Sequence, residues 1–154
     1  MRQSLSQTSE MSRGVRPALW AGLAVTAAVT AWALIDPSTT RLLAGQIEIG
    51  YPSYPSDQID SAAGAYVAIL VSVGVLGMAG WGATLLLVHT GRRWAAAWVG
   101  GVLCAAGILV ALTGLVTPDT SGVTGLAPVF GWALLAPCVV GVLAVAAMFT
   151  RRAR

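Results

Sequence analysis

The stretch AAGAYVAILVSVGVLGMAGWGATLLLV, residues 62–88, decides the fold of this chain. It contains no Asp, Glu, Lys, Arg or His. A helix needs about 20 mainly apolar residues to cross a hydrocarbon core about 30 Å thick, and only a helix satisfies every backbone N–H and C=O of one segment in lipid. The stretch therefore predicts a transmembrane helix, and its length predicts a tilt or a helical extension beyond the lipid.

Three further stretches have the same character, because residues 18–35, 94–116 and 126–149 also lack charged residues and histidine. Only 10% of the 154 residues are charged and 56% are hydrophobic, whereas soluble domains carry about 25% charged residues. A chain with so few charges cannot cover a surface that faces water. The sequence therefore predicts an all-α membrane protein whose four helices form a transmembrane bundle.

The predicted bundle covers residues 17–150 and leaves a short segment at each end. Residues 1–16 are rich in Ser, Gln and Arg, a composition that predicts a disordered cytoplasmic N-terminus. Residues 151–154 form a short basic cytoplasmic tail. An alternative interpretation makes the first span a signal peptide, with a small-x-small cleavage sequence at residues 31–33, and leaves three spans.

Nearly every arginine lies on one side of the four predicted spans. That side carries Arg2, Arg13, Arg16, Arg92, Arg93, Arg151, Arg152 and Arg154. Only Arg41 lies on the other side. Because cytoplasmic loops are enriched in Arg and Lys, we expect both termini and the turn at residues 89–93 to be cytoplasmic. The connection over residues 36–61 is then the one longer outer loop.

The composition also bears on the source of the chain and its membrane. There is no Lys and no Asn, while Ala, Gly, Val and Arg are frequent. This bias is typical of proteins from GC-rich bacteria. We therefore expect a multi-pass protein of the bacterial plasma (inner) membrane.

Small residues recur at helical spacing in three of the spans. The rows are Gly22, Thr26 and Thr30; Gly74, Gly77 and Gly80; Ala97, Gly101 and Ala105; and Ala96, Gly100 and Cys104. Small residues let helix backbones approach closely, which stabilises contacts in lipid more than burial of Leu against Leu does. The rows predict helix–helix contact faces, either within one bundle or between the copies of a homo-oligomer.

The outer loop predicts little regular structure. Ile47 and Ile49 alternate with Gln46 and Glu48, which favours a short extended piece. Tyr-Pro-Ser occurs twice in tandem over residues 51–56 and predicts an extended or turn conformation.

This loop also carries the candidate partner-binding residues, Tyr51 and Tyr54 with the acidic Glu48, Asp57 and Asp60. Aromatic residues at an exposed interface are enriched among binding hot spots. The alternative interpretation is a lid over the outer end of the bundle. No metal site is predicted, because the acidic spacing lacks the Gly and the additional oxygen ligands of a calcium loop.

Three residues deep in the spans suggest a ligand pocket. Trp81 and Trp132 offer rings that stack on a flat ligand such as a quinone or a lipid ring, and Pro137 predicts a kink in the fourth helix. The plainer interpretation is ordinary packing of aromatic residues around a proline that is tolerated in a membrane helix.

The two cysteines, Cys104 and Cys138, lie about ten residues from the cytoplasmic ends of adjacent antiparallel helices. Their similar depth suggests a redox pair within the membrane. The alternative is that both are small apolar fillers. There is no CxxC motif and no cation in either span that would activate a thiol.

The single histidine, His89, ends the second span beside a pair of arginines. A lone His with no Cys, Asp or Glu nearby does not predict a metal site. We expect a helix C-terminal cap within a set of topology and lipid head-group residues. That set comprises Arg16, His89, Arg92, Arg93, Arg151 and Arg152.

No catalytic residue and no cofactor is predicted, because the spans lack charge and the chain lacks phosphate loops and nucleophile motifs. The arginines are not gathered on one face, so no nucleic-acid partner is expected. The leading hypothesis is a non-enzymatic accessory or scaffold subunit of a plasma-membrane complex or homo-oligomer, surrounded by membrane lipids. The alternatives are a small transporter or lipid/quinone-binding protein, and a membrane thiol redox protein.

Overall fold

The computed structural model describes the backbone of residues 2–150 and the side chains of residues 15–146. Within that part the elements are α1 (Arg2–Ile35), the 3-10 helix η1 (Asp36–Ser38), α2 (Leu42–Gly50), α3 (Ser56–His89), α4 (Arg93–Val116) and α5 (Pro128–Thr150). The described residues form no β-strand, only one isolated bridge between Pro118 and Thr124. The all-α prediction is confirmed.

Four of the helices are long and apolar enough to cross a membrane. These spans are Val15–Ser38, Ser56–His89, Arg93–Val116 and Pro128–Ala146. The number and order of spans agree with the sequence prediction. The molecule is therefore a membrane protein by the length and composition of its helices.

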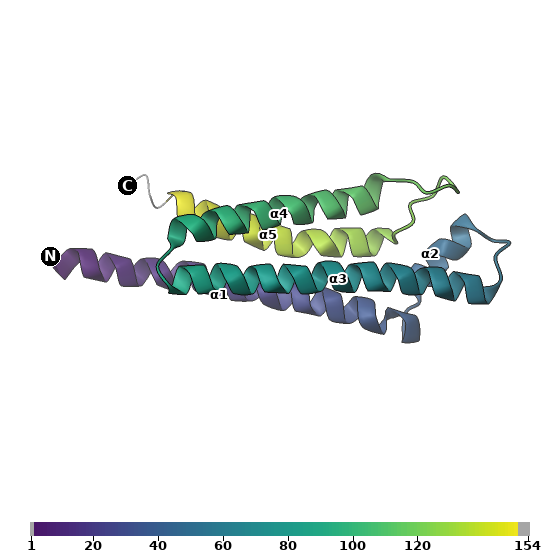
Figure 1. Ribbon diagram of the computed structural model, residues 1–154, viewed down its shortest axis with the longest axis horizontal. Coiled ribbons are helices and arrows are strands. Elements are labelled where there is room, and N and C mark those ends of the chain that lie inside the picture. The colour runs from purple at the N-terminus through teal and green to yellow at the C-terminus, as the bar shows by residue number, and fades with distance from the viewer. Residues whose placement is uncertain (1, 151–154) are drawn as a thin grey trace.

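The four long helices lie side by side along one axis (Figure 1), and their contacts form a closed ring. Along the ring α1 packs on α3, α3 on α4, α4 on α5, and α5 back on α1. The first turn of α1 and the last turn of α5 lie at the same end of the bundle (Figure 1), here called the termini end. The opposite end carries α2 and is called the capped end.

The helix α3 is the longest element whose side chains are all described. Its 34 residues span about 51 Å, compared with a hydrocarbon core of about 30 Å. It begins at Ser56, before the predicted start at residue 62, and carries Asp57 in its first turn, where a negative charge favours the helix dipole. The helix is thus six residues longer at the capped end than the predicted span, and both tilt and an extension beyond the lipid stay predictions.

The first helix begins at Arg2, where the sequence predicts a disordered segment over residues 1–16. The difference has a simple physical reason: lengthening an existing helix adds one hydrogen bond per residue and avoids the cost of a new nucleus. Pro17 lies within this helix. The predicted tail at residues 151–154 lies outside the described residues.

The small residues of α1 lie against the small residues of α3. A Cβ added at Gly74 would overlap the Thr30 side chain, and one at Gly77 would lie 3.2 Å from the methyl carbon of Thr26. Gly22 likewise has no room for a Cβ. These rows are therefore contact faces within one chain, as close approach of helices in lipid requires.

On α4 only one of the two predicted rows faces the bundle throughout. That row consists of Ala96, Gly100 and Cys104, all buried. In the other row, a Cβ at Gly101 would meet nothing within 4 Å, and Ala105 is exposed. The second row therefore packs only at its start, where Ala97 is buried.

The extended piece predicted around Ile47 is wrong, because this segment is the helix α2. Leu43, Ala44 and Ile47 are buried on one face of it and pack in a cluster with Phe130. Their spacing of one and four residues is helical, whereas the alternation over residues 46–49 was too short to distinguish strand from helix. The tandem Tyr-Pro-Ser forms the turn that follows, as predicted.

Asp36 explains where α2 begins. Its buried carboxylate accepts hydrogen bonds from the backbone N–H groups of Leu42 (2.9 Å) and Leu43 (3.2 Å) and from the Thr40 hydroxyl. These are the otherwise unpaired N–H groups of the first turn of α2, and a carboxylate there also favours the helix dipole. The preceding Arg41 adopts a left-handed conformation with φ 49°.

Candidate functional site

At the capped end, α2 is fastened to the connection between α4 and α5. The Gln46 side-chain amide donates to the Thr124 carbonyl oxygen (2.9 Å), and the Tyr51 and Thr120 hydroxyls share a hydrogen bond. A Cβ at Gly50 would lie 2.7 Å from the Ser121 hydroxyl oxygen. The two connections thus close over the end of the bundle, which agrees with the lid interpretation of the outer loop.

Asp119 organises the α4–α5 connection. Its carboxylate accepts hydrogen bonds from the Ser121 hydroxyl and from the Ser121 N–H at 2.7 Å. These two bonds, with a smaller contribution from the Tyr51 hydroxyl, hold the pKa of Asp119 below its ordinary value. The charged form of the carboxylate therefore stabilises this turn.

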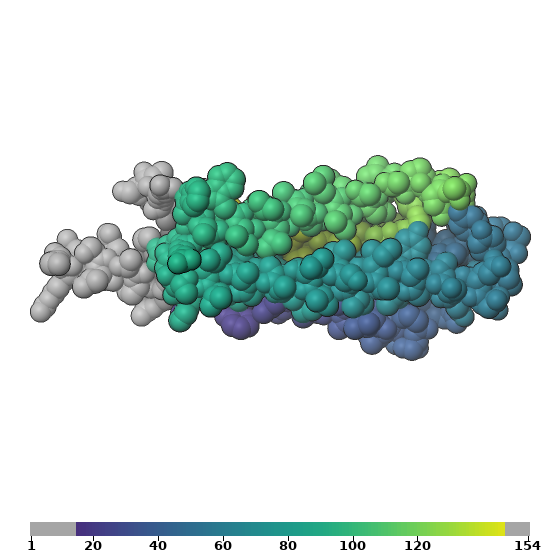
Figure 2. Space-filling view, viewed as in Figure 1, coloured from purple at the N-terminus to yellow at the C-terminus, as the bar shows by residue number. Residues whose placement is uncertain are grey.

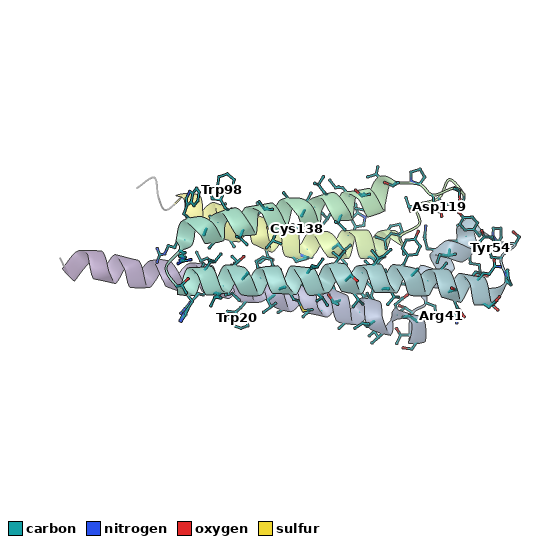
Figure 3. The ribbon with its side chains drawn as sticks, viewed as in Figure 1. Trp20, Arg41, Tyr54, Trp98, Asp119 and Cys138 are labelled. Carbon is teal, nitrogen blue, oxygen red and sulfur yellow. The ribbon has the colours of Figure 1, made fainter. Side chains whose placement is uncertain are left out.

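Tyr51 and Tyr54 form an aromatic pair on the cap. Their rings stack with centroids 4.6 Å apart and planes 19° from parallel. Tyr51 is half-buried and packs against the core cluster of the capped end, while Tyr54 is 43% exposed. Figure 3 shows Tyr54 at the tip of the capped end, on the same side as Asp119. The structure thus brings together the two predicted tyrosines and holds one of them outward.

The predicted acidic residues divide into two kinds. Glu48 and Asp57 are exposed without a described ion-pair partner. Asp60 forms an exposed salt bridge with Arg41, at 2.6 Å, so its charge is already matched. The sequence prediction missed Ile49, whose side chain is 69% exposed beside these groups. Its position becomes visible only once α2 is known to be a helix, with Ile47 facing inward.

A second candidate site is a groove in the side of the bundle between α3 and α4. Its volume is about 850 Å³. In Figure 2, α5 is visible in yellow at the bottom of a gap between these two helices, so the groove opens toward the surrounding lipid. Most of its lining residues are Gly, Ala, Val and Leu. Residues of all four long helices contribute to it.

Only two of the three predicted pocket residues line this groove. Trp81 and Pro137 line it, but Trp132 does not and is 67% exposed on the outside of α5. The indole N–H of Trp81 donates to the Thr26 hydroxyl (2.9 Å), and its ring lies over Gly22. Trp81 is thus held by packing and a hydrogen bond, with no free polar group for a ligand.

Cys104 and Cys138 also line the groove, on the facing helices α4 and α5, and both are buried free thiols. Each lies opposite a glycine of the other helix. A Cβ at Gly141 would overlap the Cys104 sulfur, and one at Gly107 would lie 2.9 Å from the Cys138 sulfur. Each thiol therefore fills the space left by a missing side chain, an arrangement that agrees with the filler interpretation.

The termini end carries positive charge. The Arg16 guanidinium donates to His89 Nδ1 (2.7 Å) and joins α1 to the last turn of α3. Arg92 and Arg93 follow in the short turn that leads to α4. Among the side chains of residues 15–146, every carboxylate lies at the capped end. The predicted head-group residues Arg151 and Arg152 lie outside the described residues.

No metal site emerges from residues 15–146, since they contain no group of three His, Cys, Asp or Glu side chains close enough to hold an ion. The fold defines an integral membrane protein with four candidate spans. Comparison with protein-family models, with curated proteins and with solved structures finds no match to this chain. Its function must therefore be argued from its own geometry.

Proposed function

We propose that this chain is a non-enzymatic accessory or scaffold subunit of the bacterial plasma membrane. It has cytoplasmic termini and binds the outer part of a larger membrane protein complex through its capped end. The observation that carries the proposal is the stacked tyrosine pair, in which Tyr51 is tied to Thr120 and Tyr54 is left exposed. A pre-positioned aromatic ring loses little conformational entropy on binding and is a frequent hot-spot residue.

The surroundings of Tyr54 support a protein partner. The exposed Ile49 adds apolar area, and the unpaired Glu48 and Asp57 add negative charge around it. An apolar and aromatic centre with a polar rim is the usual anatomy of a protein interface. The partner surface should accordingly present an apolar or aromatic pocket bordered by Arg or Lys.

Affinity purification of the full chain from its source organism in mild detergent, followed by mass spectrometry, tests this proposal. We expect a stoichiometric membrane protein partner that is lost from the Tyr54→Ala variant. Trp94→Ala is the matched control, because it removes an exposed, paired aromatic ring from the termini end, where Trp94 and Trp98 lie 5.8 Å apart. A partner that survives Tyr54→Ala, or a protein that purifies alone, would contradict the proposal.

A second candidate function is the binding of a lipid or a quinone in the lateral groove. Its volume of about 850 Å³ lies within the range of about 300–1,000 Å³ found for ligand sites. A protein that purifies alone but with one bound membrane lipid or quinone would favour this candidate over the first. A small transporter would additionally need a polar path through the bundle. Flux measurements in liposomes test whether the protein transports a solute.

A thiol redox function is the third candidate. It requires Cys104 and Cys138 to form a disulfide, which needs Cα atoms within about 7 Å. Treatment of the folded protein with a mild oxidant, followed by mass spectrometry of the peptides, tests it directly. A rapid Cys104–Cys138 cross-link would support redox chemistry, and two unmodified thiols would reject it.

A further inference from the structure

The groove between α3 and α4 is suited to hydrocarbon rather than to a polar ligand group. The polar groups in the depth of the groove, those of Thr26, Thr30 and Trp81, already have partners within the bundle. The Thr26 hydroxyl donates to the Gly22 carbonyl and accepts from Trp81, and the Thr30 hydroxyl donates to the Thr26 carbonyl. Since no buried side-chain nitrogen or oxygen of the described residues lacks a partner, the buried part of the groove offers no free hydrogen-bond donor to a quinone carbonyl.

The length of the groove matches one lipid leaflet. Its lining covers residues 70–83 on α3 and 98–110 on α4, or about 20 Å and 18 Å along the helix axes. One leaflet contributes about 15 Å of a hydrocarbon core about 30 Å thick. A single acyl chain, extended along the helices, therefore accounts for most of this length.

The charge at one end of the groove identifies the head group. The groove ends near Trp98, five residues or about 7.5 Å from Arg93 at the start of α4. Arg92 ends the turn between its two walls and Arg93 begins α4, and neither has a described carboxylate partner. A tryptophan close to arginines is typical of the layer between the hydrocarbon core and the lipid head groups.

We infer that the groove binds one acyl chain of an anionic phospholipid whose phosphate lies against Arg92 and Arg93. This inference rests on the second candidate function and names its ligand class. At the same end Arg16, held by its hydrogen bond to His89, adds to the positive field. The capped end holds the described carboxylates, so a lipid in the reverse orientation would place its phosphate near negative charge.

Native mass spectrometry of the full chain, released from mild detergent, tests the inference. The probes are a phosphatidylglycerol and a phosphatidylcholine with identical oleoyl chains. We expect one phosphatidylglycerol per protein, bound about 30-fold more tightly than phosphatidylcholine, since each arginine near the head group contributes about five-fold. The double variant Arg92→Gln and Arg93→Gln should lose this preference, whereas Arg41→Gln at the capped end should keep it.

A second pair of variants tests the groove itself. Ala106 lines the groove and is exposed, so Ala106→Leu fills it without disturbing the core. Ala105→Leu makes the same change on the adjacent exposed residue, which is outside the groove lining. We expect Ala106→Leu to abolish lipid binding and Ala105→Leu to leave it unchanged.

Three results would overturn the inference. If the wild type binds both lipids equally and Ala106→Leu abolishes that binding, the groove takes hydrocarbon chains but does not select an anionic head group. If phosphatidylglycerol binding persists in Ala106→Leu, the lipid lies elsewhere on the surface. If the protein is a dimer that Ala106→Leu dissociates, a second copy of the chain fills the groove in place of lipid.

Discussion

The indole N–H of Trp81 on α3 donates to the hydroxyl of Thr26 on α1 across 2.9 Å. The same hydroxyl donates to the Gly22 carbonyl one turn away, and the Trp81 ring covers Gly22 itself. One tryptophan thus joins two helices by a hydrogen bond and by close packing. The Trp81 ring also approaches Gly141 of α5, so three of the four long helices meet at this side chain.

Loss of the Thr26 hydroxyl should destabilise the bundle. Thr26→Val keeps the shape of the side chain but leaves the indole N–H of Trp81 without its acceptor. Hydrogen bonds between membrane helices contribute about 0.6–1.7 kcal/mol, and we expect a loss of that size in thermal unfolding in detergent. Ser72→Ala is the control, because Ser72 is exposed and bonds only to its own helix. Equal stabilities of the two variants would contradict the prediction.

The contact between α4 and α5 depends on Gly141. A Cβ there would overlap the Cys104 sulfur, so Gly141→Ala should cost about 1–3 kcal/mol, as overpacking of a close contact usually does. Gly101→Ala on α4 places the same methyl group in open space and should be neutral or slightly stabilising, since Ala favours helix over Gly. Denaturant unfolding of the two variants in parallel measures the difference. The double variant Gly141→Ala and Cys104→Ala should recover part of the loss.

Asp36 should control whether α2 is helical. Asp36→Ala removes the acceptor for the Leu42 and Leu43 N–H groups, a change that costs about 1–2 kcal/mol at a helix N-terminus. We expect faster hydrogen exchange over residues 42–50 with little change in the four long helices. Asp36→Asn retains an acceptor oxygen and should have a smaller effect. Exchange that is unchanged in Asp36→Ala would show that burial of Leu43 alone holds α2.

The α4–α5 connection should loosen in acid. The pKa of Asp119 is lowered in the folded protein by its bonds to Ser121, compared with about 3.9 for an unperturbed Asp. Its contribution to stability is therefore complete above that ordinary value and is lost as the pH falls through the lower, folded-state pKa. Hydrogen exchange over residues 117–125, taken relative to the intrinsic amide rate at each pH, should accelerate at low pH in the wild type. In the Asp119→Asn variant, exchange over these residues should already be fast at neutral pH. Identical pH profiles for the wild type and the variant would reject this role of Asp119.

The transmembrane architecture could be predicted from the sequence because its signals are long. An uncharged stretch such as residues 62–88 has few alternatives in lipid, and rows such as Gly22, Thr26 and Thr30 can pack on only one face of a helix. The short turn at residues 89–93 then requires its flanking helices to be antiparallel neighbours.

A lid over the bundle was one of the two interpretations of the outer loop, but its helical structure was not predictable, because its determinants are not local. In the sequence, Asp36 is only a polar residue that follows a span. The structure shows that its carboxylate accepts hydrogen bonds from the N–H groups of Leu42 and Leu43. The direction of Trp132, outward from the bundle, depends on how α5 is rotated against its neighbours. The kink expected from Pro137 gives no information about that rotation. The sequence thus predicts the depth of a residue along its span, but it does not predict the neighbours of that residue across the bundle.

The groove opens sideways, whereas the capped end is sealed by the completely buried Leu43 and Phe130. A lipid bound in the groove, as proposed above, would therefore exchange with the bilayer and not with the aqueous phase at the capped end. Its occupancy follows the mole fraction of the matching lipid in the membrane and is insensitive to solute concentrations in water. The chain is in this respect equipped to sample the composition of the membrane that surrounds it.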